Sequence, residues 1–443
     1  MKDVKQNEQL NKEKYLRPGG KKAVDSKYTT AVKHFVGADA PGKDGKKPPR
    51  TVKQKGIAKK AARENFSKWV AVVFVLLIGS VFVSGFFIPD ESFSPDENRI
   101  LQEAPGFSLS GYFEGRFENK LERYVEDQFP MRNAFIRMKS AMDMTAGVLE
   151  SNDVVKCRDN YLMERIKAPG DNLKKTEKAL EDFRKRYPNL KMYFLLVPNA
   201  ANILSEKLPY TVHMEDQNKY MDYFFKKAES FGYKIIDVRD EFNEDKDAVQ
   251  LYYRTDHHWT TDGAYMAYRY AIPLMELGEP IDYMPYVVKN DFNGTLYSRS
   301  GYTNGLCDEI KIYIKDDKEG FVPSAIYYAD TKEKTTEFYQ MNNLETKDAY
   351  SVFGGSNHPL YTIKTPVENK NRLLIVKDSY ANSFIPFMAQ HYREVVVVDP
   401  RYYFENIDDL MATEGITEVL FLYNANTFFL DDSIAMTLSD ESA

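Results

Sequence analysis

A carboxylate, two neighbouring imidazoles and an indole follow one another in residues 253–263, YRTDHHWTTDG. They are Asp256, His257, His258 and Trp259. Side chains alternate between the faces of an extended segment, so we expect Asp256 and His258 to point one way and His257 the other. A carboxylate that fixes the tautomer of an imidazole makes it a general base for a hydroxyl. The pattern predicts that His258 is a base oriented by Asp256.

Two other uses of these residues stay open. Asp is a favoured N-cap, so Asp256 would cap a following helix and the histidines would be bystanders in a loop. A metal site on Asp256, His257 and His258 is disfavoured, because adjacent imidazoles on opposite faces chelate poorly and no i, i+4 histidine pair accompanies them. Without a C-x-x-C pair, a Cys/His ligand spacing or a Gly-rich phosphate loop, we expect no metal and no cofactor.

A general base needs a nucleophile, which another part of the chain must supply. The apolar runs of the sequence indicate the fold and therefore where this nucleophile lies. Five short runs alternate with stretches of helical periodicity, at residues 191–197, 234–238, 372–376, 394–398 and 418–422. Wholly apolar strands separated by helices are typical of a mostly parallel sheet that is covered on both faces. We predict a doubly wound α/β domain over residues 172–443. An insertion at about residues 285–365 is expected to form a small β region beside the site.

Ligands bind in such sheets beyond the carboxyl ends of the strands. The run at residues 372–376 leads directly into KDSYANSF, which puts the hydroxyl of Ser379 at a strand-to-helix turn. The backbone N–H groups of Ser379 and Tyr380 open the next helix and suit a developing oxyanion. The alternative is that Asp378 or Ser379 only caps that helix.

Three motifs together resemble those of the DHHW family, namely the D-x-H-W of Asp256, His258 and Trp259, the D-S-Y of residues 378–380 and the DPRYY of residues 399–403. That family is similar to the alginate O-acetyltransferases, which have an SGNH-hydrolase-like fold. The resemblance extends over most of residues 93–430. It implies that Ser379 is the nucleophile, His258 its general base and Asp256 the orienting acid.

Five further residues are candidates for oxyanion stabilisation or substrate binding, namely Tyr380, Asn199, Arg401, Trp259 and His257. Asn199 follows a strand end and is a candidate oxyanion donor. The wider group implies a basic residue near Ala200, where this chain has NAAN at residues 199–202. Arg401 would bind a carboxylated sugar, fix the loop of Ser379, or only bridge to a surface acid.

The 20 residues 69–88 carry no charge and would span about 30 Å as a helix. They predict a transmembrane helix. Residues 1–68 carry 19 Lys and Arg against 7 Asp and Glu, so the positive-inside rule places this tail in the cytoplasm and the rest outside. The tail has few large aliphatic residues and is expected to be a disordered, solvated arm without a nucleic-acid role.

Residues 89–171 form a predicted juxtamembrane helical region. One apolar stripe at helical spacing consists of Phe117, Leu121, Tyr124, Val125 and Phe129. We expect it to pack into a core, with a partner-binding helix as the alternative. On the outer side, Cys157 and Cys307 would form a disulfide only with Cα atoms within about 7 Å, which leaves two unpaired thiols as the other possibility.

These features predict a single-pass membrane protein whose outer domain O-acylates, in the first place O-acetylates, a cell-envelope or secreted polysaccharide. Activated acyl donors are cytoplasmic, so the resemblance implies a multi-span membrane-bound O-acyltransferase partner that passes the group across. Two other functions stay open. The same triad would serve an esterase with water as acceptor, and a non-enzymatic polysaccharide-binding or scaffold protein would use the cluster structurally.

Overall fold

The computed structural model describes residues 52–85, 87–94, 99–302, 305, 307–315 and 324–439. Predictions for residues 1–51, the larger part of the basic tail, lie outside this part of the chain. The chain divides into two units, Met1–Ile78 and Gly79–Ala443. The strands of the described residues all belong to the second unit.

A single long helix, α1 (Val52–Ser84), contains residues 69–84 of the predicted membrane span. Its segment Arg63–Ser84 is the one stretch among the described residues that is long and apolar enough to cross a bilayer. None of this stretch is buried against the protein, and Phe74 is 61% exposed. The helix ends at Ser84 rather than at Ile88, so the helical part of the span lies closer to the N-terminus than we expected.

After α1 the chain forms a two-stranded ribbon of β1 (Phe93–Ser94) and β2 (Arg99–Ile100). Three short helices come next, α2 (Leu109–Phe113), α3 (Arg116–Asp127) and α4 (Arg132–Thr145). The two predicted helices on either side of Pro130 are confirmed. The prediction that the apolar stripe of α3 packs into a core is wrong, because no residue of α3 is buried. A three-stranded antiparallel sheet of β3 (Glu150–Ser151), β4 (Val154–Lys156) and β5 (Leu162–Glu164) comes next.

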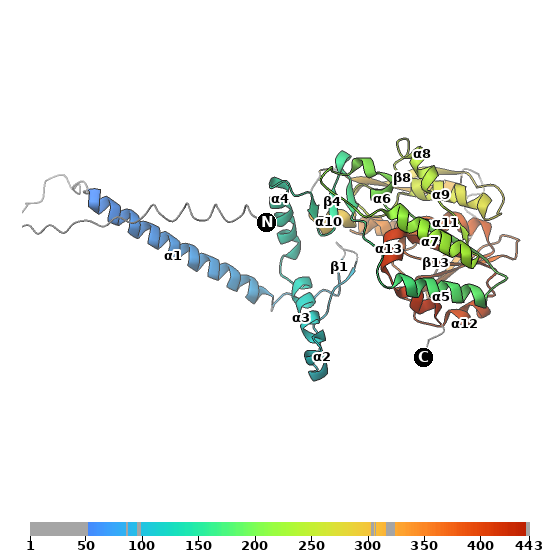
Figure 1. The fold of residues 1–443 in the computed structure, drawn as a ribbon, viewed down its shortest axis with the longest axis horizontal. Coiled ribbons are helices and arrows are strands. Elements are labelled where there is room, and N and C mark those ends of the chain that lie inside the picture. The colour runs from blue at the N-terminus through green and yellow to red at the C-terminus, as the bar shows by residue number, and fades with distance from the viewer. Residues whose placement is uncertain are drawn as a thin grey trace, which may run out of the picture. The chain divides into compact units, whose positions relative to one another are not determined.

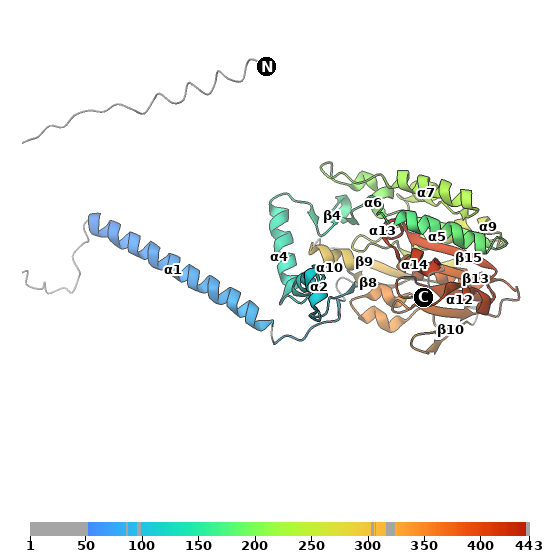
Figure 2. The same ribbon diagram turned by 60° about the horizontal axis from the view of Figure 1, so that its bottom comes forward.

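The centre of the domain is an eight-stranded sheet in the order β11-β10-β12-β14-β13-β15-β6-β7. Five neighbouring strands are parallel, namely β14 (Glu394–Val398), β13 (Arg372–Lys377), β15 (Glu418–Asn424), β6 (Lys191–Val197) and β7 (Lys234–Ile235). These are the five predicted apolar runs. Helices cover both faces of the sheet, as Figure 1 and Figure 2 show, so the predicted doubly wound α/β fold is confirmed.

The predicted insertion extends the main sheet and also forms a ribbon of its own. Its strands β10 (Ala325–Tyr328), β11 (Lys334–Thr335) and β12 (Leu360–Lys364) add antiparallel to β14, which makes the sheet mixed. Within the part of the chain that the structure describes, β8 (Tyr283–Phe292) and β9 (Asp308–Lys315) pair only with each other. The side chains of β12 alternate between buried and partly exposed. This pattern suits a strand of an antiparallel region that has one face packed on the core and the other face closer to solvent.

Alternate residues of the central strands point into two separate cores. In β13, Leu373 and Ile375 join one cluster, and Leu374 and Val376 join the other. The second cluster contains residues of α5 (Leu173–Arg186), α7 (Gln217–Phe231), α12 (Ile407–Glu414), α13 (Ala425–Leu430) and α14 (Ser433–Leu438). The first contains residues of α6 (Ala200–Ile203), α8 (Arg239–Asp245), α9 (Thr261–Leu274) and α11 (Ile385–Met388). Because parallel strands end at one edge, the loops after β13, β14, β15 and β6 gather there.

Candidate active site

Ser379 stands at the end of β13, where a 3₁₀ turn, Ser379–Ser383, begins. The preceding Asp378 is buried and caps this turn by accepting from the backbone N–H of Tyr380 at 2.9 Å. Its other oxygen accepts from the N–H of Asn424 at 2.9 Å, which ties the turn to the end of β15. Asp378 is therefore the cap, and the partly exposed Ser379 keeps its hydroxyl for another partner.

The DHHW segment bends instead of extending. Tyr252 pairs with Trp259 in an isolated antiparallel bridge, and Asp256 Oδ1 accepts from the N–H of His258 at 3.0 Å, the contact of an Asx turn. The prediction of side-chain alternation is therefore wrong, and the His257 ring lies 3.9 Å from the His258 ring. The turn itself brings the Asp256 carboxylate beside His258. Thr260, not Asp256, caps the following helix.

Three side chains from the DHHW segment and the β13 turn form a hydrogen-bonded chain. The Nδ1 atom of His258 lies 2.6 Å from Asp256 Oδ1, and its Nε2 atom lies 2.8 Å from Ser379 Oγ. An ionised carboxylate only accepts, so the proton of a neutral His258 belongs on Nδ1. Nε2 then accepts from the serine hydroxyl. This is the geometry in which an imidazole can take a proton from serine.

Asp256 is held by the start of α10 (Thr295–Ser300). The backbone N–H and the hydroxyl of Thr295 donate to Asp256 Oδ2 at 2.7 and 3.0 Å. Burial alone would raise the pKa of Asp256, but His257, His258 and the N–H of Thr295 outweigh it and hold this pKa far below its usual range. Asp256 is therefore ionised and fixed from two sides.

Burial lowers the pKa of His258 to about 4, and His257 contributes in the same direction against the opposing effect of Asp256. A histidine with this pKa is neutral at pH 7, and the neutral form is the one that acts as a base. The ring also stacks on Tyr350, with the centroids 3.8 Å apart and the planes 9° from parallel. The Tyr350 hydroxyl donates to the carbonyl of Ser379 at 3.3 Å. Sequence reasoning missed Tyr350, which lies inside the insertion.

Trp259 and Tyr380 join the two segments. The indole N–H of Trp259 donates to the carbonyl of Tyr380 at 2.9 Å, and the Tyr380 hydroxyl donates to the carbonyl of His257. Both side chains are buried. Because the N–H of Tyr380 is bonded to Asp378, the N–H of Ser379 is the better oxyanion donor, since it makes no hydrogen bond among the described residues.

Arg401 takes part in a buried charge network rather than a surface bridge. Its Nε and terminal nitrogen donate to the two oxygens of Asp399 at 2.8 and 2.7 Å. Lys377, the residue before the Asp378 cap, also donates to Asp399 at 3.1 Å. Asp399 and Lys377 are almost completely buried. The network joins the ends of β13 and β14. That Arg401 fixes the loop of Ser379 or binds a carboxylated sugar stays a prediction.

The structure does not bring Asn199 to the triad. Its side-chain oxygen accepts from Gln217 at 2.7 Å and from the N–H of Asn426 at 3.2 Å. Asn426 in turn donates to Glu164 at 3.2 Å. These contacts give Asn199 a structural place between the ends of β6 and β15. Asn426, which follows β15, was not among the predicted candidates.

A cavity of about 380 Å³ has Glu164, Arg299, Arg401 and Asn426 in its wall, and no residue of the candidate triad lines it. Arg401 contributes to lowering the pKa of His258. Burial raises the pKa of Glu164, but Arg299, His257 and Asn426 reverse this shift and lower it. Two residues of the cavity wall, Glu164 and Arg401, thus interact electrostatically with His257 and His258. The size of the cavity suits a small ligand such as one sugar unit.

Asp348 is an unassigned carboxylate on the other flank. It precedes the 3₁₀ turn Ala349–Val352, which carries Tyr350. Its carboxylate makes no hydrogen bond or ion pair among the described residues. Burial, with a further contribution from Asp256, raises the pKa of Asp348 to about 6. A partly buried acid without a partner beside a candidate triad is typical of functional sites.

Ligand atoms of Asp256, His257 and His258 lie within 4.8 Å of one another, close enough for a metal ion. In the structure these atoms already make hydrogen bonds. Asp256 accepts from His258 and Thr295, and the Nδ1 of His257 lies 2.7 Å from the Thr295 hydroxyl. A metal ion there would have to displace the triad contacts.

The two alternatives for the cysteines are also resolved. The buried Cys157 and the exposed Cys307 are both free thiols and form no disulfide with each other.

The site and sheet together define an SGNH-hydrolase-like protein. Residues 161–280 match the family model for the SGNH hydrolase-like domain of acetyltransferase AlgX. This segment includes Asp256, His257 and His258 and ends before Ser379. The chain thus carries a domain of this type, and the predicted resemblance is confirmed. No curated protein sequence matches the chain.

Solved structures give the same fold. Bacillus cereus PatB1 superposes with a TM-score of 0.52 and 24% identity over 62% of this chain and 97% of that chain. Its form with a sulfonyl adduct gives 0.51 and 23% over 63% and 98%. A DHHW family protein from Eubacterium siraeum gives 0.51 and 22% over 65% and 95%. The chain has the fold of a DHHW family protein.

Proposed function

We propose that this chain is a membrane-anchored serine O-acyltransferase, specifically an O-acetyltransferase, whose outer domain acts on hydroxyl groups of a cell-envelope or secreted polysaccharide. One observation carries the proposal. His258 Nε2 lies 2.8 Å from Ser379 Oγ while its Nδ1 lies 2.6 Å from Asp256. The description of the matching family model, which names an acetyltransferase, supports the choice of acyl group.

The reaction would have two halves. In the first, Nε2 of His258 takes the hydroxyl proton as Ser379 Oγ attacks the acyl carbonyl, and the N–H of Ser379 donates to the developing oxyanion. His258 then gives the proton to the leaving group, which leaves an acyl ester on Ser379. In the second half, His258 takes the proton of a sugar hydroxyl, whose oxygen attacks the ester. Ser379 leaves with that proton and the sugar carries the acyl group.

We place the acceptor in the cavity lined by Glu164 and Arg401, because these two residues interact electrostatically with His257 and His258. The cavity wall presents Arg299, Glu164 and Asn426, all polar groups that can hydrogen-bond sugar hydroxyls. His257 and Trp259 differ in their proposed parts. Trp259 is buried and supports the loop, whereas the ring of His257 is 28% exposed and can contact the acceptor.

A labelling experiment tests the triad. Ser379 is expected to react covalently with a serine-directed sulfonyl fluoride, and the protein is expected to release p-nitrophenol from p-nitrophenyl acetate. Ser383→Ala is a matched control, because Ser383 is buried in the same turn and bonds Tyr350 instead of His258. Ser379→Ala should abolish both signals and Ser383→Ala should keep them. Binding of polysaccharide without labelling or turnover would support a binding module instead.

The acceptor dependence of turnover separates transfer from hydrolysis. A transferase keeps its acyl-enzyme from water, so acceptor oligosaccharide should speed release and yield an acetylated sugar by mass spectrometry. An esterase would turn over fully without acceptor and would remove acetyl groups from acetylated glycans. The enzyme and the acyl donor are the same in both measurements, so a difference between them reports only which acceptor, sugar or water, takes the acyl group in the second half-reaction.

The membrane topology is the last part of the proposal. The candidate span in α1 and the basic flank before it support a cytoplasmic N-terminus and an outer domain,. A multi-span membrane-bound acyltransferase would then pass the acyl group across the membrane. Protease added outside intact cells should digest the region after residue 90 and spare the tail. A cut tail and a protected domain would contradict this topology and leave the triad chemistry untouched.

A further inference from the structure

The most conspicuous surface that the proposed function does not use is an apolar face on α2, α3 and α4. Eight large apolar side chains of these helices and the linker between α3 and α4 are exposed, and we call them the helical apolar face: Phe113, Leu121, Val125, Phe129, Met131, Phe135, Met138 and Met142. Phe113 is 82% exposed and Met138 is 50% exposed. An exposed apolar patch of this kind marks an interaction site.

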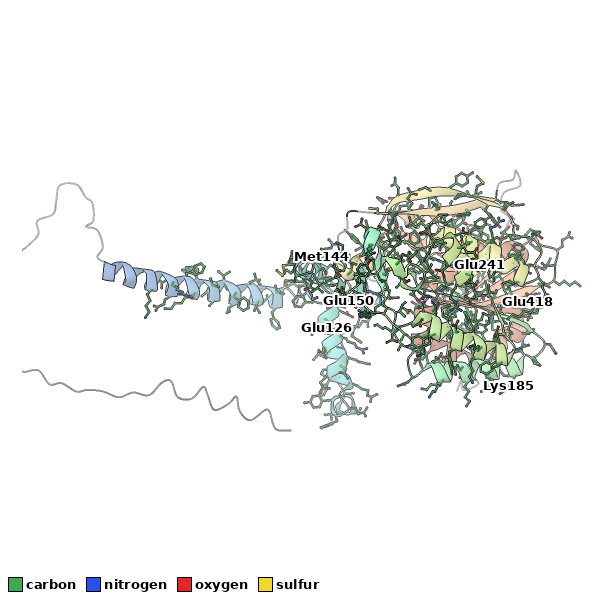
Figure 3. The ribbon with its side chains drawn as sticks, turned by 45° about the horizontal axis from the view of Figure 1, so that its top comes forward. Glu126, Met144, Glu150, Lys185, Glu241 and Glu418 are labelled. Carbon is green, nitrogen blue, oxygen red and sulfur yellow. The ribbon has the colours of Figure 1, made fainter. Side chains whose placement is uncertain are left out.

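Helix α3 is amphipathic without a core to cover. Its apolar residues Phe117, Leu121 and Val125 recur every four residues, and the helical period places Glu126, which Figure 3 labels, away from this stripe,. No residue of this helix is buried. A helix with a separate apolar face and a polar face rich in charged residues is typical of one that lies in the membrane interface.

Helix α4 carries apolar side chains on its outer side as well as on the side that faces the protein. Its Ser140 is buried, and the hydroxyl contacts Ser151 at 3.1 Å and donates to the carbonyl of Ser300. Met138 and Met142 lie on a different side of the same helix and are exposed. Ile136 and Met144, one turn before and after Ser140, face the protein as well, so Met138 and Met142 form a second apolar side that nothing among the described residues covers.

Direct contacts tie the C-terminal end of α3 to the segment that follows the membrane span. The backbone N–H of Glu91 donates to Gln128 Oε1 at 3.0 Å, and Gln128 Nε2 donates back to the carbonyl of Glu91 at 2.9 Å. The Tyr124 hydroxyl donates to Asp90 at 3.0 Å. Asp90 and Glu91 follow the exposed Phe87 and Ile88 within a few residues of the end of α1 at Ser84. The C-terminal end of α3 is thus bonded to the segment that leaves the candidate span.

We infer that the helical apolar face rests on the phospholipid bilayer surface into which α1 inserts. Its charges indicate what kind of lipid it needs. Arg116, Lys120 and Arg123 of α3 stand against Glu118, Glu122, Glu126 and Asp127, so the helix has no cationic excess for anionic headgroups. The face binds by burying apolar side chains, and phosphatidylcholine alone suffices.

This docking fixes how the site is presented to the membrane. Ser140 of α4 bonds the carbonyl of Ser300 at the end of α10, and Thr295 at the start of α10 bonds Asp256. One six-residue helix therefore connects the lipid-facing α4 to the candidate triad. The active-site domain is held by two attachments, the span and the helical apolar face.

Site-specific fluorescence in vesicles tests the inference. The full chain with Cys307→Ser has the buried Cys157 as its one remaining thiol, whose pKa burial raises to about 12. An environment-sensitive fluorophore is placed on Leu121→Cys, Met138→Cys or the matched polar-side Glu126→Cys. Each protein is reconstituted in phosphatidylcholine vesicles that contain nitroxide-labelled lipid. Labels at Leu121 and Met138 should be quenched at least about twofold more than the label at Glu126.

The contrary results are distinct. Equal quenching at the three positions would overturn the inference, as would a Leu121 label shielded from both lipid nitroxide and aqueous iodide, which indicates cover by a second copy or another protein. A requirement for anionic lipid would overturn the apolar mode of docking. A label at Phe74→Cys in α1 checks the span itself. If Phe74 is not quenched, the span is absent and the inference falls with it, while the triad proposal stands.

Discussion

Gly294 lies against the carboxylate of Asp256, so closely that a Cβ atom built on this glycine would overlap the Asp256 side chain. The conformation of Gly294 is an ordinary extended one, so the constraint is space and not backbone freedom. The next residue, Thr295, donates two hydrogen bonds to the same carboxylate. Gly294 and Thr295 thus fix the carboxylate of Asp256 from the side opposite His258.

Gly294→Ala is therefore expected to displace Asp256 and lower kcat for p-nitrophenyl acetate on the order of 10³- to 10⁴-fold, the scale of losing a triad acid. Gly106→Ala is the matched control, because a Cβ at Gly106 meets no atom within 4 Å. Circular dichroism checks that both variants fold. Full activity in the folded Gly294→Ala protein would show that Asp256 is not needed where the structure has it.

The two histidines should differ in their effect. His258→Ala removes the base that contacts Ser379 at 2.8 Å, so its loss should equal that of Ser379→Ala, because triad members act as a unit. His257→Ala leaves this contact and should retain a sizeable part of the hydrolysis of p-nitrophenyl acetate. Transfer to oligosaccharide should fall further than hydrolysis if His257 contacts the acceptor. Equal losses in both reactions for both variants would mean that the base is misassigned.

The hydrogen-bonded chain of Asp256, His258 and Ser379 could be predicted from the sequence, because each member belongs to a local pattern; its catalytic role stays a proposal. Ser379 follows an apolar strand, and Asp256 and His258 are two residues apart. The reasoning for His257 was wrong although the assignment of His258 agrees with the geometry. An Asx turn, which the sequence pattern of alternating faces does not contain, joins Asp256 to His258,.

The supporting residues could not be predicted, because they converge only in the folded chain. Gly294, Thr295, Asp348 and Tyr350 lie within the insertion, far in sequence from both motifs, and no local pattern marks them. The same is true of the mixed sheet, since the antiparallel pairing of β12 with β14 depends on a long connection. Asn199 shows the converse error. It follows a strand end as expected, but its side chain turns toward Gln217.

The pH profile should report the buried base. With the pKa of His258 lowered to about 4, the protonated and inactive form accumulates only in acid. We expect kcat/KM for p-nitrophenyl acetate to fall as the pH drops through about 4 and to be level near neutral pH. An ordinary histidine would place this limb near about 6.5. An acid limb near that higher value would indicate a solvated base and contradict the buried arrangement with Tyr350.

Asp348→Asn should stabilise the protein at alkaline pH. The pKa of Asp348 is raised from 3.8 to about 6 in the folded state, so the folded state binds its proton more tightly than the unfolded state. Ionisation therefore opposes folding, and the stability contribution of this group falls as the pH rises from 3.8 to about 6. The neutral amide removes that cost, so Tm should rise at pH 8 and change little at low pH, where Asp348 is protonated in both states. Glu279→Gln, at an exposed carboxylate, is the matched control. A lower Tm at pH 8 for Asp348→Asn would show that the carboxylate has a stabilising partner, and the proposal of an unpaired acid beside the site would fail.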